Sequence, residues 1–557
     1  MVFRLVRAAL LLTLLLTGVS LSLPKSAVAS TPPAPTLIAE VNGPGKGRVW
    51  VGAIPPGSTS KPVLVFVHGL HGKAQNWWGP TVYNGTNDMY NLAYFSGYRT
   101  AFVSLDDEVD GPASSMWANG ATLNKQLDVI LRHFGVSSVN VIAHSKGGVD
   151  TNSAIVHYGA SSKIQKLVTL GSPHHGSQLA DLAYSWWAWW LAALLGQHDD
   201  GTYVMQTGYM SYFRSVTDYR AENRNVRIYT SGGTDHGPWF SAEWFGGLYL
   251  SQYGSNDGVV TVASSHHPLQ YARLFTADID HDGIRKGSLV WSRIEPTVRS
   301  TWRTSSVESD VAASRIALTG GRNQGRAKPM PQEQTSSVIL RGGTLEGDSA
   351  LLSLPVEENV REITFDLLAA SDQLSVAVID PAGVSYPVAQ PVADEGIFRG
   401  AFHYSVTVPK PQSGSWSVKI SGPQHAPFLL VADLDSPLQA RLVRDQALVK
   451  RGGNFRLSAS VEAGGRPANR VDVEALLTGT PQGGRGAKAP QTHQRASASG
   501  KGRAGMAMTA PGAVGLYQLG VTVTGISPAG LPYERSFPMN MPVITDGMKA
   551  DTLPAGN

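Results

Sequence analysis

Cysteine is absent from the 557 residues, so the folded chain has to reach its stability without disulfide bonds. Charged residues are also scarce, at 16%, whereas hydrophobic residues make up 42%. This composition excludes an intrinsically disordered chain, which would be rich in charge and poor in apolar side chains. The length exceeds that of one ordinary domain, so we expect several separately folded units.

No apolar run is long enough to span a membrane. The longest one at the N-terminus, Ala8–Leu16, follows Arg4 and Arg7 and falls short of the roughly 20 residues that a spanning helix needs. A polar stretch then ends in the small residues 27–29, Ala-Val-Ala. This order is typical of a secretory signal peptide, so residues 1–29 are predicted to be cleaved after Ala29 and the mature protein to be extracellular.

The net charge of +4 gives no sign of a polyanionic partner. The predicted signal peptide removes Arg4, Arg7 and Lys25 and no acidic residue, which leaves the mature chain almost neutral. Neither nucleic acid nor an anionic membrane is required as a partner.

Residues 30–299 are predicted to form one α/β domain. Short apolar strands alternate with helical patterns there, which favours a mostly parallel sheet with helices on both faces. The strands are expected at 61–67, 98–105, 139–143, 166–170, 226–230 and 272–276, and the clearest helices at 115–133 and after residue 145.

The remaining sequence predicts an all-β region. Residues 300–337 are polar and rich in Ser, Gly and Gln, which is typical of an interdomain linker. Beyond them a period of two predicts two β-sandwich (Ig-like) domains, at 338–436 and 437–545, followed by a tail at 546–557. Within the second domain, 480–502 is predicted to be a long loop.

The strongest local motif is Ala143-His144-Ser145-Lys146-Gly147. A nucleophilic serine on a sharp strand-to-helix turn needs small residues two positions before and after it, because the strand and helix backbones approach closely. Ala143 replaces the usual first glycine, and Gly147 is retained. The apolar run before the motif and the helical pattern after it fit this turn, so Ser145 is predicted to be a nucleophile.

Four segments together resemble the bacterial secreted lipases and esterases of the α/β-hydrolase superfamily. They are 66–70 (Phe-Val-His-Gly-Leu), 143–148, 171–177 (Gly-Ser-Pro-His-His-Gly-Ser) and 256–260 (Asn-Asp-Gly-Val-Val), and the resemblance covers residues 60 to 295. It implies an α/β-hydrolase fold and carboxylic ester hydrolysis through an acyl-enzyme. No cofactor is required.

A serine hydroxyl needs a base, and the base needs an orienting acid. In this fold the chain order is serine, acid, histidine. The resemblance places the acid at Asp257, and the position after the final predicted strand favours His281 as the base. Asp235 is a competing acid. The other candidates are more typical of structural or supporting residues, namely Asp150, His174, His175, His266 and His267.

An acyl-transfer site also needs two N–H groups directed at the oxyanion. One is expected from the backbone of Lys146, at the start of a helix. The resemblance assigns the second to the backbone of Leu70, with His68 bracing the loop rather than reacting.

Tryptophans are concentrated in one segment, with Trp186, Trp187, Trp189 and Trp190 in five consecutive positions. Successive helical residues turn by about 100°, so these rings cannot all enter one core. An apolar lid over the substrate is predicted around 178–215, with Trp77 and Trp78 lining the same entrance. The alternative is that the segment packs against a C-terminal sandwich.

Two further questions stay open at this stage. Alternating Asp278, Asp280 and Asp282 could hold a structural calcium ion or cap a helix, so no metal ligands are assigned. The expected substrate is a lipid ester at an interface. The alternatives are an extracellular polyester (polyhydroxyalkanoate) depolymerase, whose sandwiches would contact the polymer or another surface, and a non-catalytic surface-binding protein.

Overall fold

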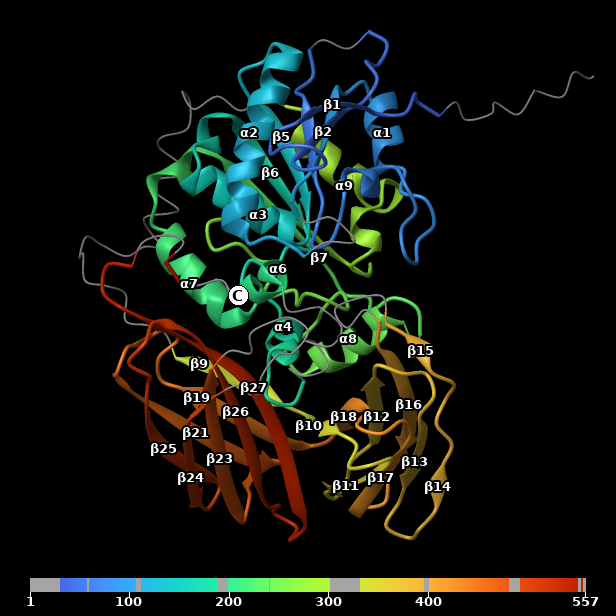
Figure 1. Cartoon of the computed structure of the whole chain (residues 1–557), viewed down its shortest axis with the longest axis vertical. Helices are drawn as coiled ribbons and strands as arrows, with labels where there is room; N and C mark the ends of the chain where they lie inside the picture. The colour runs from blue at the N-terminus through green and yellow to red at the C-terminus, as the bar shows by residue number, and fades with distance from the viewer. Residues whose placement is uncertain are drawn as a thin grey trace, which may run out of the picture.

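The structure is a computed structural model that describes residues 31–57, 60–106, 112–188, 199–239, 241–300, 331–394, 400–479, 491–548 and 552–553. An α/β domain forms one end of the molecule, and two β-sandwiches lie side by side at the other (Figure 1). The predicted signal peptide lies outside the described residues. Within these ranges no helix is both long and apolar enough to cross a membrane.

The α/β domain is built on an eight-stranded sheet of order β1-β2-β4-β3-β5-β6-β7-β8. Strands β3 to β8 pair in parallel, and β1 and β2 add an antiparallel edge. The central strands are apolar and buried, as strands covered on both faces must be. The bounds are β1 Thr36–Glu40, β2 Arg48–Val51, β3 Leu64–Val67, β4 Thr100–Ser104, β5 Val139–His144, β6 Ile164–Leu170, β7 Arg227–Gly233 and β8 Ala272–Ala277. The predicted fold class is confirmed.

Helices cover both faces of this sheet. Helices α2 (Met116–Phe134) and α3 (Lys146–His157) share one apolar cluster with the sheet, and α1 (Met89–Phe95) and α9 (Gly287–Val298) share another on the opposite face. The Ser115 hydroxyl caps the start of α2, and Gly135 ends it in a left-handed conformation. Short 3-10 helices are η1 Ala74–Trp77, η2 Ala160–Ser162, η3 Ala221–Asn225 and η4 Gly283–Arg285.

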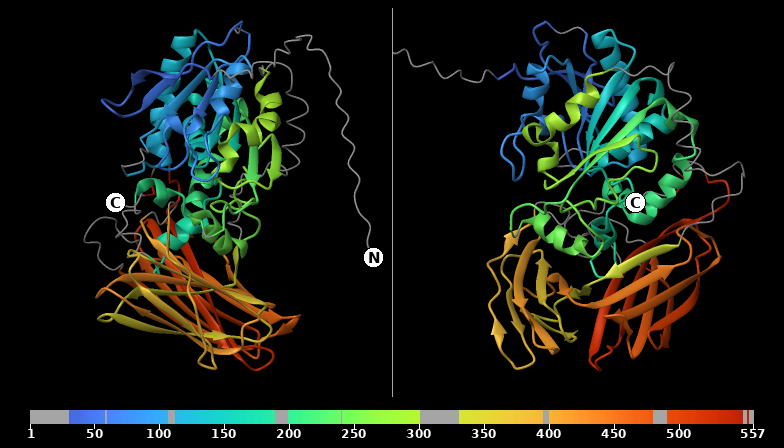
Figure 2. Two further views of the ribbon diagram at one scale, coloured as in Figure 1. Left: turned by 90° about the vertical axis from the view of Figure 1, so that its right-hand side faces the viewer. Right: turned by 180° about the vertical axis from the view of Figure 1, so that it is seen from behind.

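Four further helices lie between the sheet and the sandwiches (Figures 1 and 2). The segment between β6 and β7 contains α4 (Gln178–Ala183), α6 (Asp200–Val204) and α7 (Thr207–Thr217), and α8 (Ala242–Ser251) follows β7. The described parts of the predicted lid, 178–215, fall in this layer. The four helices α4, α6, α7 and α8 are hereafter called the lid layer.

Two sandwiches make up the C-terminal half, and their strands pair antiparallel except for β20 with β27. In the first, sheet β10-β18-β12-β16-β15 accompanies sheet β11-β17-β13-β14. In the second, sheet β22-β21-β19-β9, with β25 on β21, accompanies β20-β27-β26-β23-β24. The bounds are β9 Gln332–Ser336, β10 Val338–Thr344, β11 Ser349–Val356, β12 Glu362–Ala369, β13 Ser375–Ile379, β14 Ser385–Tyr386, β15 Val392–Ala393, β16 Phe402–Pro409, β17 Gly414–Ser421, β18 Pro427–Asp435, β19 Leu438–Arg444, β20 Val449–Lys450, β21 Asn454–Ala463, β22 Arg466–Pro467, β23 Arg470–Gly479, β24 Thr492–Gly500, β25 Arg503–Thr509, β26 Gly515–Ile526 and β27 Pro532–Ile544.

Two sequence-based boundaries need correction. The end of the predicted linker forms β9, which pairs with β19 and so belongs to the second sandwich rather than to a connector. The end of the predicted loop at 480–502 forms β24, which pairs with β23. Strand β9 is polar, and the only apolar side chains of β24 are the small Ala496 and Ala498, so both strands have weak sequence signals.

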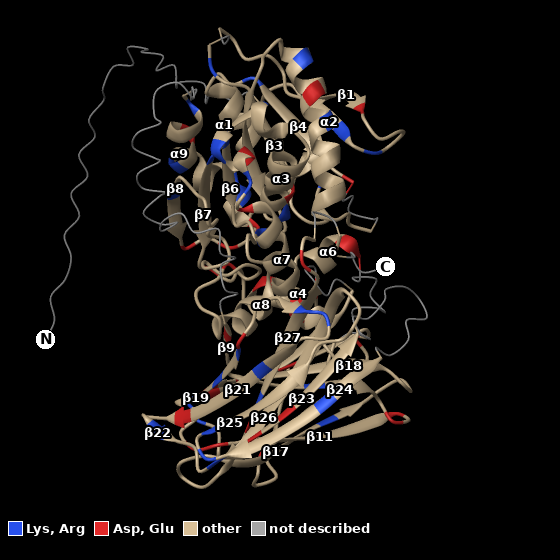
Figure 3. Cartoon of the chain, turned by 90° about the vertical axis from the view of Figure 1, so that its left-hand side faces the viewer, with Lys and Arg blue, Asp and Glu red and all other residues tan. Residues whose placement is uncertain are grey.

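The α/β domain and the sandwiches share one apolar core. A single cluster of buried residues includes Leu179 and Tyr209 from the lid layer and Leu340, Leu429 and Leu516 from the sandwiches. Basic and acidic positions are interspersed along the ribbon of both halves of the molecule in Figure 3. The C-terminal half is therefore packed against the α/β domain and is not merely tethered to it.

A buried ion pair joins the two sandwiches. Arg535 of β27 and Glu357, just after β11, are fully buried and hydrogen-bonded to each other. Replacing Arg535 by Met leaves the Glu357 carboxylate buried without its counter-ion, so we expect the free energy of unfolding to fall by about 3–5 kcal/mol. Urea denaturation measures this loss. The double variant Arg535→Met/Glu357→Leu should recover most of it, and a single variant within about 1 kcal/mol of the wild type would contradict the prediction.

Candidate active site

Ser145 occupies a strained turn between β5 and α3. Its φ and ψ of 52° and −134° are unfavourable for a residue with a side chain. The turn is tight because α3 starts against the end of β3. A Cβ atom at Gly147 would lie 2.2 Å from the carbonyl oxygen of His68. Gly147 is therefore required by backbone contact, as the sequence motif indicated.

Ser145, His281 and Asp257 form a hydrogen-bonded series. The distance from Ser145 Oγ to His281 Nε2 is 3.0 Å, and from His281 Nδ1 to Asp257 Oδ2 it is 2.9 Å. The carboxylate accepts a hydrogen bond from Nδ1–H, so Nε2 is the unprotonated nitrogen and accepts a hydrogen bond from the serine hydroxyl. Ser145 and His281 are each 7% exposed, and Asp257 is completely buried.

The backbone around Asp257 fixes the direction of its carboxylate. Oδ1 accepts hydrogen bonds from the amides of Val259 and Val260, at 3.1 and 2.7 Å, so Oδ2 faces His281. The amide of His281 in turn donates to the Asp257 carbonyl at 2.9 Å. Gly171, in a left-handed conformation, leaves the space beside this contact, because its Cβ would lie 2.9 Å from Asp257 Oδ2.

The competing residues have other partners. Asp235 accepts a hydrogen bond from the amide of Gly237, and Asp150 forms a buried ion pair with Lys146 Nζ at 2.9 Å. His267 contacts Arg214 at 2.8 Å and stacks edge-on against His174. Burial lowers the pKa of both of these histidines well below the usual value. Of the two predicted acids, the one in contact with His281 is Asp257.

The loop that carries Leu70 is braced by His68. The Leu105 amide donates to His68 Nε2 at 2.9 Å, and Nδ1 donates to the carbonyl of Gly69 at 2.7 Å. The next residue, His71, contacts the Asp199 carboxylate of the lid layer at 2.6 Å. Leu70 thus lies in a loop that is tied to Leu105 and to the lid layer, and Lys146 lies at the start of α3.

His144 is a residue that sequence reasoning missed. Its Nε2 donates to the carbonyl of His281 at 2.9 Å, and the two rings lie 4.8 Å apart. Burial lowers the pKa of His144 well below the usual value, and the neighbouring His281 adds to the effect. A neutral imidazole therefore anchors the backbone of His281. The sequence signal that could have identified His144 is its position directly before Ser145 in the motif.

The tryptophans do not line one entrance. Trp77 is fully buried against Phe66 in the core of the α/β domain, and Trp78 is half-buried against Phe102. Trp187 lies against Gly342 and Gly520 of the sandwiches, and Trp186 is 40% exposed. The described part of this segment therefore follows the packing alternative. Trp189 and Trp190 lie outside the described residues.

The aspartates around His281 serve the loop. Asp280 accepts a hydrogen bond from Asn84 at 2.9 Å, and Asp282 pairs with Arg285 at 2.5 Å. Burial raises the pKa of Asp282, but Arg285 and the amides of Tyr83 and Val82 hold it at about 2. Within the described parts of the chain, no group of three or more His, Asp or Glu residues could hold a metal ion.

Comparison with known proteins identifies the family of this chain. Residues 58–185 match the model of the PGAP1-like alpha/beta domain. A solved lipase of Bacillus licheniformis (BlEst2), in its propeptide form, is 26% identical with a TM-score of 0.67 over 88% of this chain and 96% of its own. The chain belongs to the lipases and esterases of the α/β-hydrolase fold.

Two further matches cover a smaller part of this chain. The mature form of the same Bacillus lipase is 39% identical over 46% of this chain and 99% of its own, with a TM-score of 0.42. Triacylglycerol lipase 2 of Saccharomyces cerevisiae is 30% identical over 151 residues. The match to the yeast protein covers 26% of this hydrolase and 45% of that protein.

The backbone contact at Gly147 generates a stability prediction. In Gly147→Ala the new methyl group meets the His68 carbonyl, so this hydrolase should lose about 1–3 kcal/mol through overpacking. Gly512→Ala is the matched control, because a Cβ there meets nothing within 4 Å. Thermal unfolding of both variants measures the difference. Equal unfolding temperatures in the two variants would show that the turn tolerates a side chain.

Proposed function

We propose that the chain is a secreted carboxylic ester hydrolase in which Ser145, His281 and Asp257 act as nucleophile, base and orienting acid. The observation that carries this proposal is the continuous hydrogen bonding of the three side chains around a strained serine. Family membership supports the hydrolase chemistry, and the order of the residues along the chain fits this fold.

The geometry suggests the following reaction. His281 Nε2 takes the proton of Ser145 as Oγ attacks the ester carbonyl carbon, and the amides of Leu70 and Lys146 stabilise the oxyanion. The C–O bond to the alcohol then breaks, and His281 returns its proton to the leaving oxygen. Water, deprotonated by His281, then attacks the carbonyl carbon of the acyl-enzyme. The bond from this carbon to Ser145 Oγ breaks, His281 returns the proton to Oγ, and the acid is released. Asp257 stabilises the imidazolium in both half-reactions.

We propose a lipid ester as the substrate. The names of the yeast and Bacillus relatives support a lipid, and the layer above the serine is rich in apolar residues. Polyester depolymerisation is the alternative within the same chemistry. The non-catalytic alternative is disfavoured, because a protein that only binds a surface has no need of an oriented base and acid beside a strained serine.

A second role is proposed for the C-terminal sandwiches. The similar Bacillus structure is in a propeptide form, and its likeness covers 88% of this chain, which extends beyond the α/β domain. In this chain the sandwiches cover the lid layer and share its core. We therefore propose that they act as a propeptide that restricts access to Ser145.

Replacement of the triad tests the proposed mechanism. Ser145→Ala should abolish hydrolysis of p-nitrophenyl butyrate. Asp257→Asn should lower kcat by about 10⁴-fold, because an amide stabilises the wrong tautomer of His281. Asp235→Asn is the matched control and should keep the wild-type kcat. Hydrolysis that survives in Ser145→Ala, or a loss confined to Asp235→Asn, would overturn the assignment.

A substrate series tests the proposed specificity. Initial rates on emulsified triacylglycerols of increasing acyl length, on a polyhydroxyalkanoate film and on soluble p-nitrophenyl esters should be greatest with the emulsions. The apolar lid layer gains contacts with acyl chains there. A faster release of acid from the film would identify the polymer as the substrate class.

A further inference from the structure

A small polar network crosses the apolar interface between the lid layer and the sandwiches. At its centre, Asn540 of β27 is fully buried. Its side-chain oxygen accepts from the Gly208 amide at 2.6 Å, and its side-chain nitrogen donates to Asp181 at 2.5 Å. Its backbone carbonyl accepts from Arg444 at 2.8 Å. One sandwich residue therefore binds both α4 and the start of α7.

Asp181 completes the connection within the lid layer. Its carboxylate accepts from the amide of Thr207 at 2.8 Å and from the Thr207 hydroxyl at 2.7 Å. The fit is tight, because a Cβ at Gly208 would lie 1.9 Å from the side-chain oxygen of Asn540. Asp181, Thr207, Gly208 and Asn540 are hereafter called the latch.

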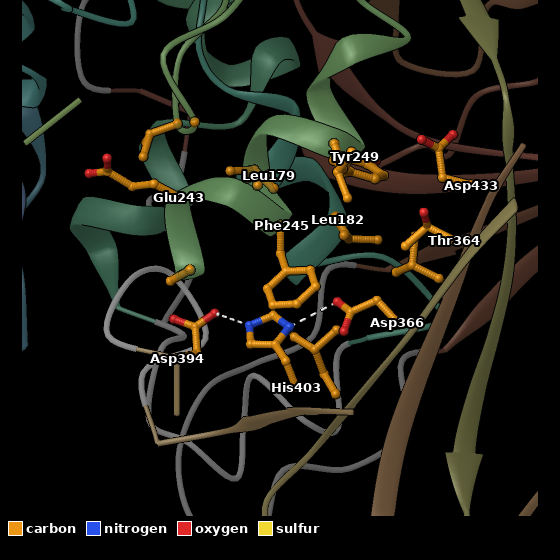
Figure 4. Close-up of a pocket in the computed structure, with 17 residues that line it drawn as sticks. Leu179, Leu182, Glu243, Phe245, Tyr249, Thr364, Asp366, Asp394, His403 and Asp433 are labelled. Atoms are coloured by element: carbon orange, nitrogen blue, oxygen red, sulfur yellow. Dashed lines mark hydrogen bonds and ion pairs between the residues drawn. The ribbon is translucent and has the colours of Figure 1, made fainter. Parts of the chain in front are cut away.

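The latch is set among apolar and aromatic contacts. Beside it, Phe245 of α8 stacks on His403 of β16 with ring centroids 4.1 Å apart and planes inclined by 8° (Figure 4). Burial opposes a charge on His403, but the carboxylates of Asp366 and Asp394 raise its pKa to about 10. Side chains of α4, α8 and the first sandwich leave only a cavity of about 60 Å³ between them.

The lid layer that the latch holds reaches the active site. In α6, a Cβ at Gly201 would lie 2.8 Å from the side chain of Leu70. Asp199, which caps α6, contacts His71 of the same loop. Helices α4 and α7 flank α6 along the chain. Release of α4 and α7 from the sandwiches would therefore free the segment that packs on the loop beside Ser145.

The latch contains a carboxyl group that titrates near neutrality. Burial raises the pKa of Asp181 to about 7, against the opposing effects of Thr207 and Asn540. The other ionisable groups that face it are Arg444 of β19 and the phenols of Tyr249 and Tyr253 on α8. The Arg444 guanidinium favours the carboxylate, whereas both phenols stay neutral because burial raises their pKa.

Because Asp181 has a raised pKa when it is buried, the docking of the sandwiches on the lid layer depends on pH. In an open state, with the sandwiches separated from the lid layer, Asp181 would be hydrated and would titrate near its ordinary pKa of 3.8. The closed state is the one seen in the structure. The closed state binds the proton more tightly. The closed state is therefore most favoured at low pH, weakens as pH rises from about 4 to about 7, and weakens no further above that.

We propose that α4, α7 and α8 form a reversible docking surface for the chain's own C-terminal sandwiches, closed by the contact of Asn540 with Asp181, and that acid favours the docked state. The docking itself does not depend on the proposed function. Its expected effect, a change in the access of substrate to Ser145, does rest on that function. The geometry that carries it is the buried network itself.

Hydrogen–deuterium exchange on the full chain tests the proposal without reference to catalysis. After correction for intrinsic exchange rates, wild-type amides of α4 and α7 should open up to about 30-fold more at pH 8.5 than at pH 5.5. Asp181→Asn keeps the size and the acceptor oxygen but cannot titrate, so this pH response should disappear. Asn540→Leu should expose α4 and α7 at both pH values.

The control is Asp433→Asn. Asp433 also lines the cavity between α4, α8 and the first sandwich, and burial raises its pKa to about 6. Its carboxylate accepts from Ser337 rather than from a residue of the latch. This variant should therefore keep the wild-type pH response in α4 and α7. A response that persists in Asp181→Asn, or protection of α4 and α7 that is unchanged in Asn540→Leu, would overturn the latch.

Parallel rate measurements separate this proposal from the proposed function. The ratio of kcat/KM between the wild type and Asp181→Asn on p-nitrophenyl butyrate cancels every pH dependence of catalysis that the two chains share. The ratio should rise by up to about 30-fold between pH 5.5 and 8.5. If Ser145→Ala still hydrolyses esters, the proposed function fails, whereas the exchange results still decide whether the latch exists.

Discussion

The contact between the start of α3 and the end of β3 is the constraint on which the active site depends. Because the backbone of Gly147 lies against the His68 carbonyl, the chain must reverse sharply at Ser145, and the serine takes a strained conformation. The same contact places the Lys146 amide opposite the loop of Leu70. One close approach of two backbones thus fixes the turn of Ser145, and the proposed oxyanion donors, the amides of Leu70 and Lys146, belong to the two segments that flank this contact.

Asp257 and His281, the proposed acid and base, are held beside this turn through hydrogen bonds to the backbone. His281 is held from one side by the Asp257 carbonyl and from the other by His144, and the Asp257 carboxylate is held by two amides. The Asp257 carboxylate is thus positioned by main-chain amides, and the backbone of His281 is held by the Asp257 carbonyl and by the buried side chain of His144. This arrangement keeps the orientation of the imidazole fixed while its charge changes during the proposed reaction.

The sequence was sufficient for the parts of the structure that local patterns encode. The parallel strands were predicted because buried strands read as apolar runs, and the serine turn because small residues have to flank it. Trp77 and Trp187 could not be placed, since an aromatic residue fits a core, an entrance or an interface equally well. Strands β9 and β24 were missed because β9 is polar and β24 has only two small apolar residues, so their pairing with β19 and β23 is the clearer sign of strand structure.

Asn540 illustrates a further limit of sequence reasoning. It lies in β27, far along the chain from Asp181 and Gly208, and nothing in its local pattern distinguishes it from a surface residue. Its role arises only when the two halves of the molecule pack together. An apolar pair at these positions would bind the halves without dependence on pH, whereas a buried carboxyl hydrogen-bonded to an amide ties docking to proton binding. A polar contact in an otherwise apolar interface therefore stabilises the docked state less than an apolar contact would, but it makes the association specific and reversible.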